Sequence, residues 1–94
     1  MHVVMRSYSG QGGSDLLDLL EQREQEVREL ISGVPGFIHY VAFRTDDGGC
    51  TVTVCEGKEG TDESSRRAAD WVKQNVTTSI DAPRTAEGDA VLQF

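Results

Sequence analysis

Short runs that alternate between apolar and polar residues, or that are rich in β-branched and aromatic ones, predict four strands. They span residues 2–8, 37–44, 50–56 and 85–94. The cluster Asp46-Asp47-Gly48-Gly49 is a strong turn signal between the second run and the third. These two strands are therefore expected to form an antiparallel hairpin.

Two segments carry apolar residues at helical spacing. The first begins at Ser14, a good N-cap, and runs to about Ile31. The second begins at Thr61 or Asp62 and continues to between Val76 and Ile80. The glycine-rich residues 10–13 that precede the first helix are expected to be a flexible connector, because they lack the pattern of a phosphate-binding loop.

The element order β-α-β-β-α-β over residues 1–94 predicts one α+β domain with a ferredoxin-like fold and a four-stranded antiparallel sheet. Each β-α-β unit crosses over in the right-handed sense. Both helices should therefore cover one face of the sheet and leave the other face uncovered.

Alternation within the strands assigns their side chains to two faces. The more apolar set is expected under the helices: Val3, Met5, Phe37, His39, Val41, Phe43, Cys50, Val52, Val54, Ala90, Leu92 and Phe94. The second set mixes apolar with polar residues: His2, Val4, Arg6, Tyr8, Ile38, Tyr40, Ala42, Arg44, Thr51, Thr53, Cys55, Val91 and Gln93.

The mixed set is expected on the uncovered face, where two interpretations remain open. The favoured one is a dimer interface, at which Tyr and Arg are common and which Tyr40→Ala should disrupt. The other is a ligand pocket, expected as a closed cavity on the order of a few hundred Å³ with a few polar groups in an apolar lining.

Charge and cysteine content narrow the possible partners. The chain has 9 Lys and Arg against 16 Asp and Glu, a formal charge of -7 that repels nucleic acid. No signal peptide and no apolar run of about 20 residues is present, so no membrane contact and a cytoplasmic location are expected. Cys50 and Cys55 are too far apart on one strand for a disulfide and too few for a metal site, so free thiols and no metal are expected.

The segment Val34–Gly48, VPGFIHYVAFRTDDG, resembles part of the dimeric α/β-barrel superfamily and, within it, the antibiotic-biosynthesis-monooxygenase-like group. The Pro-Gly-Phe, the aromatic residue that follows and the Arg before an acidic-Gly turn carry this resemblance. It implies a homodimer whose sheets pack into a shared barrel. It also implies a pocket in each protomer and a cofactor-independent monooxygenase-like activity on a small aromatic or hydrophobic molecule.

Some members of this superfamily degrade haem and carry an Asn on the first strand and a Trp or His on the second helix. Here the first strand offers Arg6 and Tyr8, and the second helix offers Trp71 and Asn75 without a following His. The haem-degrading pattern is not met, and no cofactor is expected.

Five residues are the candidate substrate-binding set: Arg6, Tyr8, Tyr40, Arg44 and Trp71. The arginines could bind an anion or a carboxylate, and the indole could stack on a substrate. The structural alternatives are ion pairs across a dimer seam and a tryptophan at the edge of the core. The protein as a whole could equally be a non-enzymatic dimeric binding or structural module.

The two histidines and one cysteine complete the candidates. His39 could act as a general base, since imidazole titrates near neutral pH, but its apolar neighbours favour a buried structural role. His2 lies beside the first residue and is expected to be frayed. Cys55 would be reactive only if a positive neighbour lowered its pKa.

Overall fold

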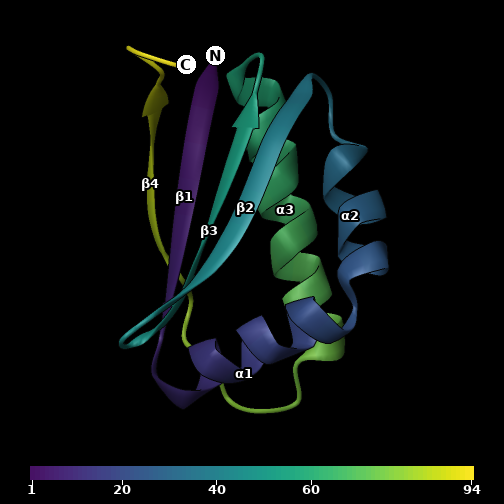
Figure 1. Ribbon diagram of the computed structural model, residues 1–94. Coiled ribbons are helices and arrows are strands. Elements are labelled where there is room, and N and C mark those ends of the chain that lie inside the picture. Colours follow the sequence, from purple (N-terminus) through teal and green to yellow (C-terminus); the bar gives the residue numbers. More distant parts are fainter.

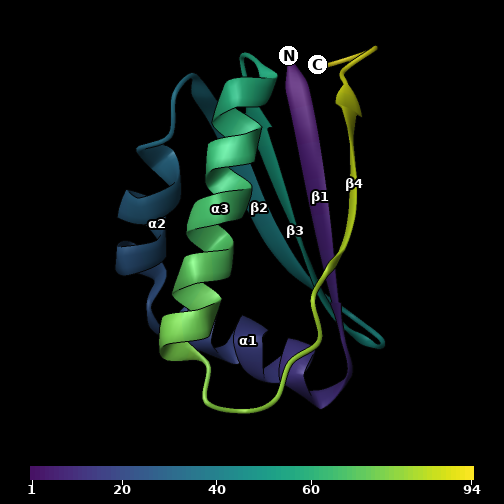
Figure 2. The same cartoon turned by 180° about the vertical axis from the view of Figure 1, so that it is seen from behind.

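The computed structural model describes residues 1–94, which form a four-stranded sheet with three helices on one face (Figures 1 and 2). In chain order the elements are β1 His2–Ser9, α1 Gly10–Gln22, α2 Glu24–Ser32, β2 Phe37–Thr45, β3 Gly48–Cys55, α3 Lys58–Asn75 and β4 Arg84–Asp89. The sheet order is β2-β3-β1-β4, and every neighbouring pair is antiparallel. The predicted ferredoxin-like fold is confirmed. None of the helices has the length and apolar character needed to cross a membrane.

The first helical region differs from the single helix predicted for residues 14–31. It is two helices that meet at Arg23, whose φ of -115° and ψ of 37° interrupt the helical path. The break re-aims the chain, so α1 crosses the end of the sheet while α2 lies beside α3 (Figure 1). Leu16 of α1 and Val27 and Ile31 of α2 are nevertheless buried in the same hydrophobic cluster.

The glycine-rich segment is the first part of α1 and not a connector, so that prediction is wrong. Gly12 and Gly13 are buried, and a Cβ at Gly13 would collide with the backbone carbonyl of Tyr8. These glycines allow the helix to approach the backbone closely. The glycines are there because the helix packs closely against the strand. From composition alone, such a segment resembles a flexible linker.

The last strand also differs from the prediction, since β4 covers Arg84–Asp89 and residues 90–94 lie beyond it. Asp89 pairs with His2, which is the first residue of β1. Beyond Asp89, β4 therefore has no further residue of β1 with which to pair. One further backbone hydrogen bond joins the Ala90 amide to the Met1 carbonyl. Val91, Leu92 and Phe94 are highly exposed, so the apolar tail is not a core strand.

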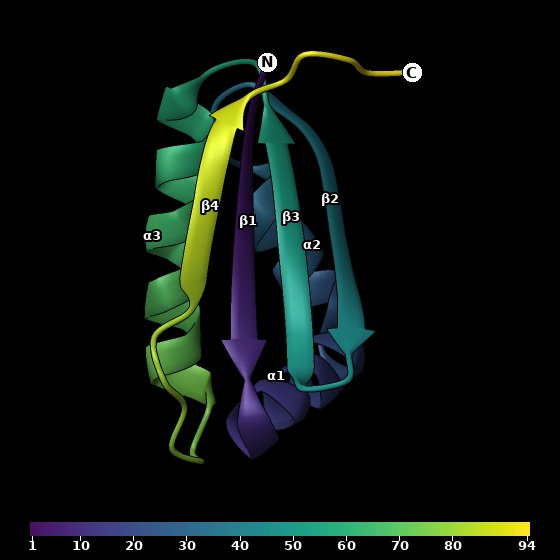
Figure 3. The same ribbon diagram turned by 90° about the vertical axis from the view of Figure 1, so that its left-hand side faces the viewer.

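The two sheet faces are the reverse of those predicted. Figure 3 shows the uncovered face in front, with all helices behind the sheet. On β1, Val4, Arg6 and Tyr8 are buried beneath the helices, whereas Met5 on the uncovered face is 38% exposed. Cross-strand pairs share a face, so the register extends this assignment to the other strands.

The count of apolar residues gave the wrong faces, because an apolar sheet face can be buried either by the helices of the same chain or by another protein surface. The count alone does not distinguish these two cases. On β1, on β3 and on β2 beyond Ile38, the mixed set lies against the helices and the apolar set lies on the uncovered side. Val41 and Phe43 of that apolar set are 43% and 46% exposed in the single chain. A dimer interface made of the mixed set, and with it the disruption expected from Tyr40→Ala, is therefore ruled out by position.

A register shift in β2 separates Phe37 from the residues that follow it. Phe37 pairs with Cys55, but His39 pairs with Val54, so Ile38 is the extra residue of a bulge. The bulge leaves Phe37 packed against the core, while His39 is exposed. The predicted set of Phe37, His39, Val41 and Phe43 on one face is broken by this one residue.

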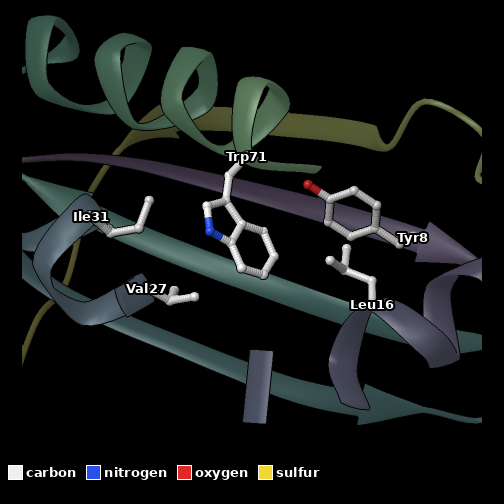
Figure 4. Close-up of a cluster of buried hydrophobic side chains, with 5 residues drawn as sticks. All are labelled: Tyr8, Leu16, Val27, Ile31 and Trp71. Carbon is white, nitrogen blue, oxygen red and sulfur yellow. The ribbon is translucent and has the colours of Figure 1, made fainter. Parts of the chain in front are cut away.

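The core between sheet and helices is centred on Trp71. Figure 4 shows the indole reaching from α3 between Val27 and Ile31 on one side and Tyr8 and Leu16 on the other. Trp71 is 7% exposed. Its structural interpretation as a core residue is confirmed, although it lies within the core and not at the edge.

Candidate functional site

A cleft of about 810 Å³ lies between β2 and the helices α1 and α2. Its lining is mainly apolar: Leu17, Leu20, Glu21, Glu24, Val27, Arg28, Ile31, Ser32, Phe37, His39, Tyr40, Ala42, Phe43 and Arg44. Several residues of its rim, including His39 and Arg44, are exposed, so it opens to solvent. The expected closed cavity is thus a larger, open one, on the helix-covered side of the sheet.

Charged side chains on the rim of the cleft neutralise one another. One guanidinium nitrogen of Arg44 lies 2.8 Å from an oxygen of Asp18 and 2.9 Å from one of Glu21. Arg28 forms a second pair with Glu24 at 2.8 Å. The rim therefore offers little unpaired charge to a ligand.

A second, much smaller void of about 20 Å³ lies deeper between the sheet and the helices. It is lined by Arg6, Tyr8, Leu16, Leu20, Val27, Leu30, Ile31, Tyr40, Thr51, Ala68, Trp71 and Val72. A void of this size holds about one water molecule. Leu20, Val27, Ile31 and Tyr40 line both spaces, so the void and the cleft share a wall.

Arg6 is the one charged residue that lines the inner void, and it is 3% exposed. Its Nη1 donates to Oγ of Ser64 at 3.3 Å and to Oγ of Ser65 at 2.9 Å. Its Nη2 donates to Oγ1 of Thr53 at 3.0 Å. Its Nε has no hydrogen-bond partner, and neither does the buried Oγ1 of Thr51.

Burial keeps the two site tyrosines protonated at neutral pH. It raises the pKa of Tyr40 to about 12, against the opposing effect of the Arg6 charge. It also raises the pKa of Tyr8, where the Arg6 guanidinium again acts in the opposite direction. Both phenol groups can therefore donate hydrogen bonds but cannot readily accept a proton as bases.

The structure brings four of the five predicted residues together. Arg6, Tyr8, Tyr40 and Trp71 line the inner void, and Tyr40 also lines the cleft. Arg44 lies apart from them on the rim. The sequence placed them on one sheet face or on the second helix, but it assigned that face to the wrong side of the sheet.

Helix residues complete the site and were missed. Leu20, Val27 and Ile31 line both spaces, yet their helical spacing is the same as that of ordinary core residues. Thr51 was placed on the correct face but not among the site candidates. The feature of the sequence that could have identified Thr51 is its hydroxyl group, which lies on the polar face of a strand whose opposite face is apolar.

The two histidines differ from the predictions, whereas the cysteines are free as predicted. His39 is exposed on the cleft rim, so a buried structural role is wrong. His2 is not frayed but buried, with Nδ1 3.1 Å from Asp89 and Nε2 2.9 Å from Glu87. Cys50 and Cys55 are free and buried, and burial raises the pKa of the Cys55 thiol. No group of three or more His, Cys, Asp or Glu side chains is arranged to hold a metal ion.

Solved structures with a similar fold include those of a haem degrader and of two oxygenases. The haem degrader MhuD of Mycobacterium tuberculosis, with two haems bound in its active site, has a TM-score of 0.71 at 15% identity, over 100% of this chain and 99% of that one. A monooxygenase from the gene ActVA-Orf6 of Streptomyces coelicolor, in complex with nanaomycin D, has a TM-score of 0.58 at 18% identity, over 99% and 90% of the two chains.

A third neighbour is SnoaB, a cofactor-independent oxygenase from Streptomyces nogalater, with a TM-score of 0.50 at 12% identity over 98% of this chain and 92% of that one. No family model and no curated protein sequence matches the chain. At these identities the neighbours establish the fold, and they agree with the resemblance seen in residues 34–48.

Proposed function

We propose that this protein is a homodimeric, monooxygenase-like enzyme that binds a small aromatic or hydrophobic molecule in the cleft between β2 and the helices. The observation that carries the proposal is the cleft itself, with a volume of about 810 Å³ and a mainly apolar lining. Ligand sites are typically of this size and composition, with a few polar groups that fix orientation. Neighbours with the same fold hold haem or nanaomycin D.

The uncovered sheet face supports the homodimer. It presents Val3, Met5, Val41, Phe43, Val52 and Val54. Three of them, Met5, Val41 and Phe43, are more than a third exposed in the single chain. Apolar patches of this kind on a small domain mark an interaction site. Two sheets packed face to face would bury it and form a barrel. Phe43, on the edge strand β2, borders both this face and the cleft, whose other walls are on the helix side.

A cofactor-independent oxygenation draws its electrons from the substrate. Conversion of an activated CH₂ group to a carbonyl consumes one O₂, places one oxygen atom in the product and releases the other as water. The four electrons come from the two C–H bonds that break, so no external reductant is needed. The substrate must first lose a proton to become electron-rich, and the protein's task is to bind and stabilise that anion.

A non-enzymatic binding module is the second candidate, and the carboxylates and the tyrosine of the cleft favour it, which leaves His39 as the one other candidate base in the lining. Glu21 and Glu24 are both paired with arginines, and the pKa of Tyr40 is about 12. An efficient general base has a pKa near the working pH. A substrate that is already acidic would remove this difficulty, because it would arrive deprotonated.

The histidines of this chain do not offer haem a buried ligand in the cleft. Helix α3, Lys58–Asn75, contains no histidine. The one histidine that lines the cleft, His39, is on β2 with an exposed side chain. We therefore derive no step through haem.

Two measurements test the proposal. Isothermal titration calorimetry with 2-naphthamide, a flat neutral molecule, should show binding to the wild type and loss of binding in Leu20→Trp, which fills the cleft. Val91→Ala, on the exposed tail, is the control and should bind as the wild type does. Binding that is absent in the wild type, or unchanged by Leu20→Trp, would contradict the assigned cleft.

The second measurement separates enzyme from binding module. Anthrone offers an acidic CH₂ between aromatic rings, and an oxygen electrode follows its conversion to anthraquinone. One O₂ consumed per anthraquinone, faster than without protein and abolished by Leu20→Trp, supports the enzyme. Calorimetric binding of anthrone with no oxygen consumption above the background supports the non-enzymatic alternative.

A further inference from the structure

Arg6 is a buried positive charge without a negative partner. No carboxylate lies within 4.0 Å of its guanidinium, which donates hydrogen bonds to the hydroxyls of Ser64, Ser65 and Thr53 and lies beside the neutral phenol of Tyr8. By contrast, Arg44 on the rim pairs with acidic residues. Burial of an unpaired charge is unfavourable. The chain has 16 acidic residues, yet none of them forms an ion pair with Arg6. The missing partner is therefore expected to be an anion from outside the chain.

Two polar atoms around the inner void also lack partners. They are Nε of Arg6 and Oγ1 of Thr51, both on side chains that are 3% exposed. Buried polar atoms nearly always have a hydrogen-bond partner, so two in one void indicate a place for another polar atom. A void of about 20 Å³ admits one oxygen atom of a ligand but no aromatic ring.

The position of the void fixes how such a ligand would lie. Tyr40 forms part of the wall between void and cleft, together with three apolar residues of α1 and α2. A ring in the apolar cleft would therefore direct one substituent past Tyr40 toward Arg6. The ring and its substituent would occupy separate but adjoining spaces.

We propose that the inner void is an oxyanion subsite, which takes one ionised oxygen of a flat aromatic acid, either a carboxylate or a phenolate. Arg6 supplies the positive charge and a free N–H, and the hydroxyls of Thr51 and Tyr40 add hydrogen bonds. This rests on the proposed function, since it requires the ligand ring to occupy the cleft. It deepens that function by naming the substrate class.

The chemistry of the void favours an anion over a neutral group. Arg6 can only donate hydrogen bonds, and the phenols of Tyr8 and Tyr40 are held protonated. No carboxylate or imidazole lines the void. An amide oxygen can accept the same hydrogen bonds, but only an anionic oxygen also balances the positive charge of Arg6.

A matched pair of probes tests the subsite. 2-Naphthoate and 2-naphthamide have nearly the same shape and differ in charge, and calorimetry at pH 7 gives both dissociation constants. The wild type is expected to prefer the carboxylate by about tenfold or more, as for a hydrogen bond to a charged group. Arg6→Gln should abolish the preference, while Arg44→Gln, on the rim, should retain it.

A second variant covers the case in which Arg6→Gln fails to fold. Thr51→Val removes a hydroxyl that makes no hydrogen bond of good geometry and has only the neutral Tyr40 phenol beside it, so the fold should be retained, as circular dichroism can verify. It should weaken 2-naphthoate binding by about fivefold, the effect of one hydrogen bond, and leave 2-naphthamide unchanged. Equal weakening of both probes, or of neither, would count against the subsite.

4-Nitrophenol examines the phenolate form, because only its anion is yellow. Near its own pKa, binding to the wild type should increase the yellow fraction, and binding to Arg6→Gln should not. An increase supports a subsite for both anions, and its absence alongside a naphthoate preference supports one for carboxylates alone. Equal naphthoate and naphthamide affinities in the wild type would overturn the subsite but leave the cleft. Binding of none of the probes would overturn both.

Discussion

The indole Nε1 of Trp71 on α3 donates a hydrogen bond of 2.6 Å to Oε2 of Glu26 on α2. This hydrogen bond joins α2, which forms one wall of the cleft, to α3, which covers the core. The Asn75 amide donates to the Trp71 carbonyl and its Oδ1 accepts from Arg23, where α1 and α2 meet. The position of α2, and with it the width of the cleft, is thus linked to Trp71.

Replacement of Trp71 should therefore destabilise the fold in proportion to what is removed. Trp71→Ala is expected to lower the free energy of unfolding by about 3–5 kcal/mol because it leaves a cavity in the core. Trp71→Phe should cost about 1–3 kcal/mol, since the ring remains but the hydrogen bond and part of the volume are lost. Urea unfolding measures both. A Trp71→Phe variant as stable as the wild type would show that the bond to Glu26 contributes nothing.

Neighbouring residues of β2 test the assignment of the two sheet faces. Val41→Asp places a carboxylate on the apolar, uncovered face and should raise the dissociation constant of the proposed dimer by roughly two orders of magnitude or more. Tyr40→Ala, one residue away on the helix side, should remain dimeric. Light scattering gives the mass of each. A dimer in Val41→Asp or a monomer in Tyr40→Ala would restore the opposite assignment.

His2 makes stability depend on pH. Hydrogen bonds to Glu87 and to Asp89 raise its pKa above 6.5. The imidazolium is favoured in the folded state, so this stabilisation is complete below about pH 6.5 and is lost as the pH rises through the higher folded value. The melting temperature of the wild type should fall over this range more than that of His2→Gln. Parallel profiles for the two proteins would contradict the arrangement.

The ion pair between His2 and Glu87 also makes stability depend on pH in the acid range, where stability falls as the pH is lowered. The hydrogen bond from His2, ahead of that from Lys58, lowers the pKa of Glu87 below its usual 4.5. A carboxylate with a lowered pKa contributes stability above its ordinary pKa and loses it as the pH falls through the folded value. Glu87→Gln should therefore lose less stability than the wild type when the pH is lowered below about 4.5, as melting curves would show.

Both cysteines should react slowly with thiol reagents in the native protein. Cys50 is 3% exposed and Cys55 is fully buried, and burial raises the pKa of Cys55, which lowers its thiolate fraction. Ellman's reagent should detect two thiols rapidly in urea and far more slowly in native buffer. Rapid reaction of either thiol in native buffer would mean that the region around β3 opens readily.

Fold class could be predicted because each element has a local signal. The hairpin at Asp46–Gly49 and the order of strands and helices survive small errors in their boundaries. The ends of β4 and the break at Arg23 could not be predicted in the same way, since pairing with β1 and packing against the sheet decide them.

The site could be predicted by residue but not by side of the sheet. Arg6, Tyr8 and Tyr40 share a face whatever lies against it, because alternation is a property of the strand. Which face the helices cover depends on long-range packing. A face that mixes polar and apolar groups is suited to a ligand site, and the more apolar face was mistaken for the core.

The most direct test of the account is the crystal structure of the protein with 2-naphthoate. The ring is expected in the cleft between β2 and the helices, with a carboxylate oxygen within hydrogen-bond distance of Arg6 Nε and Thr51 Oγ1. A naphthoate bound on the uncovered sheet face, or one whose carboxylate points out past Arg44 into solvent, would contradict it.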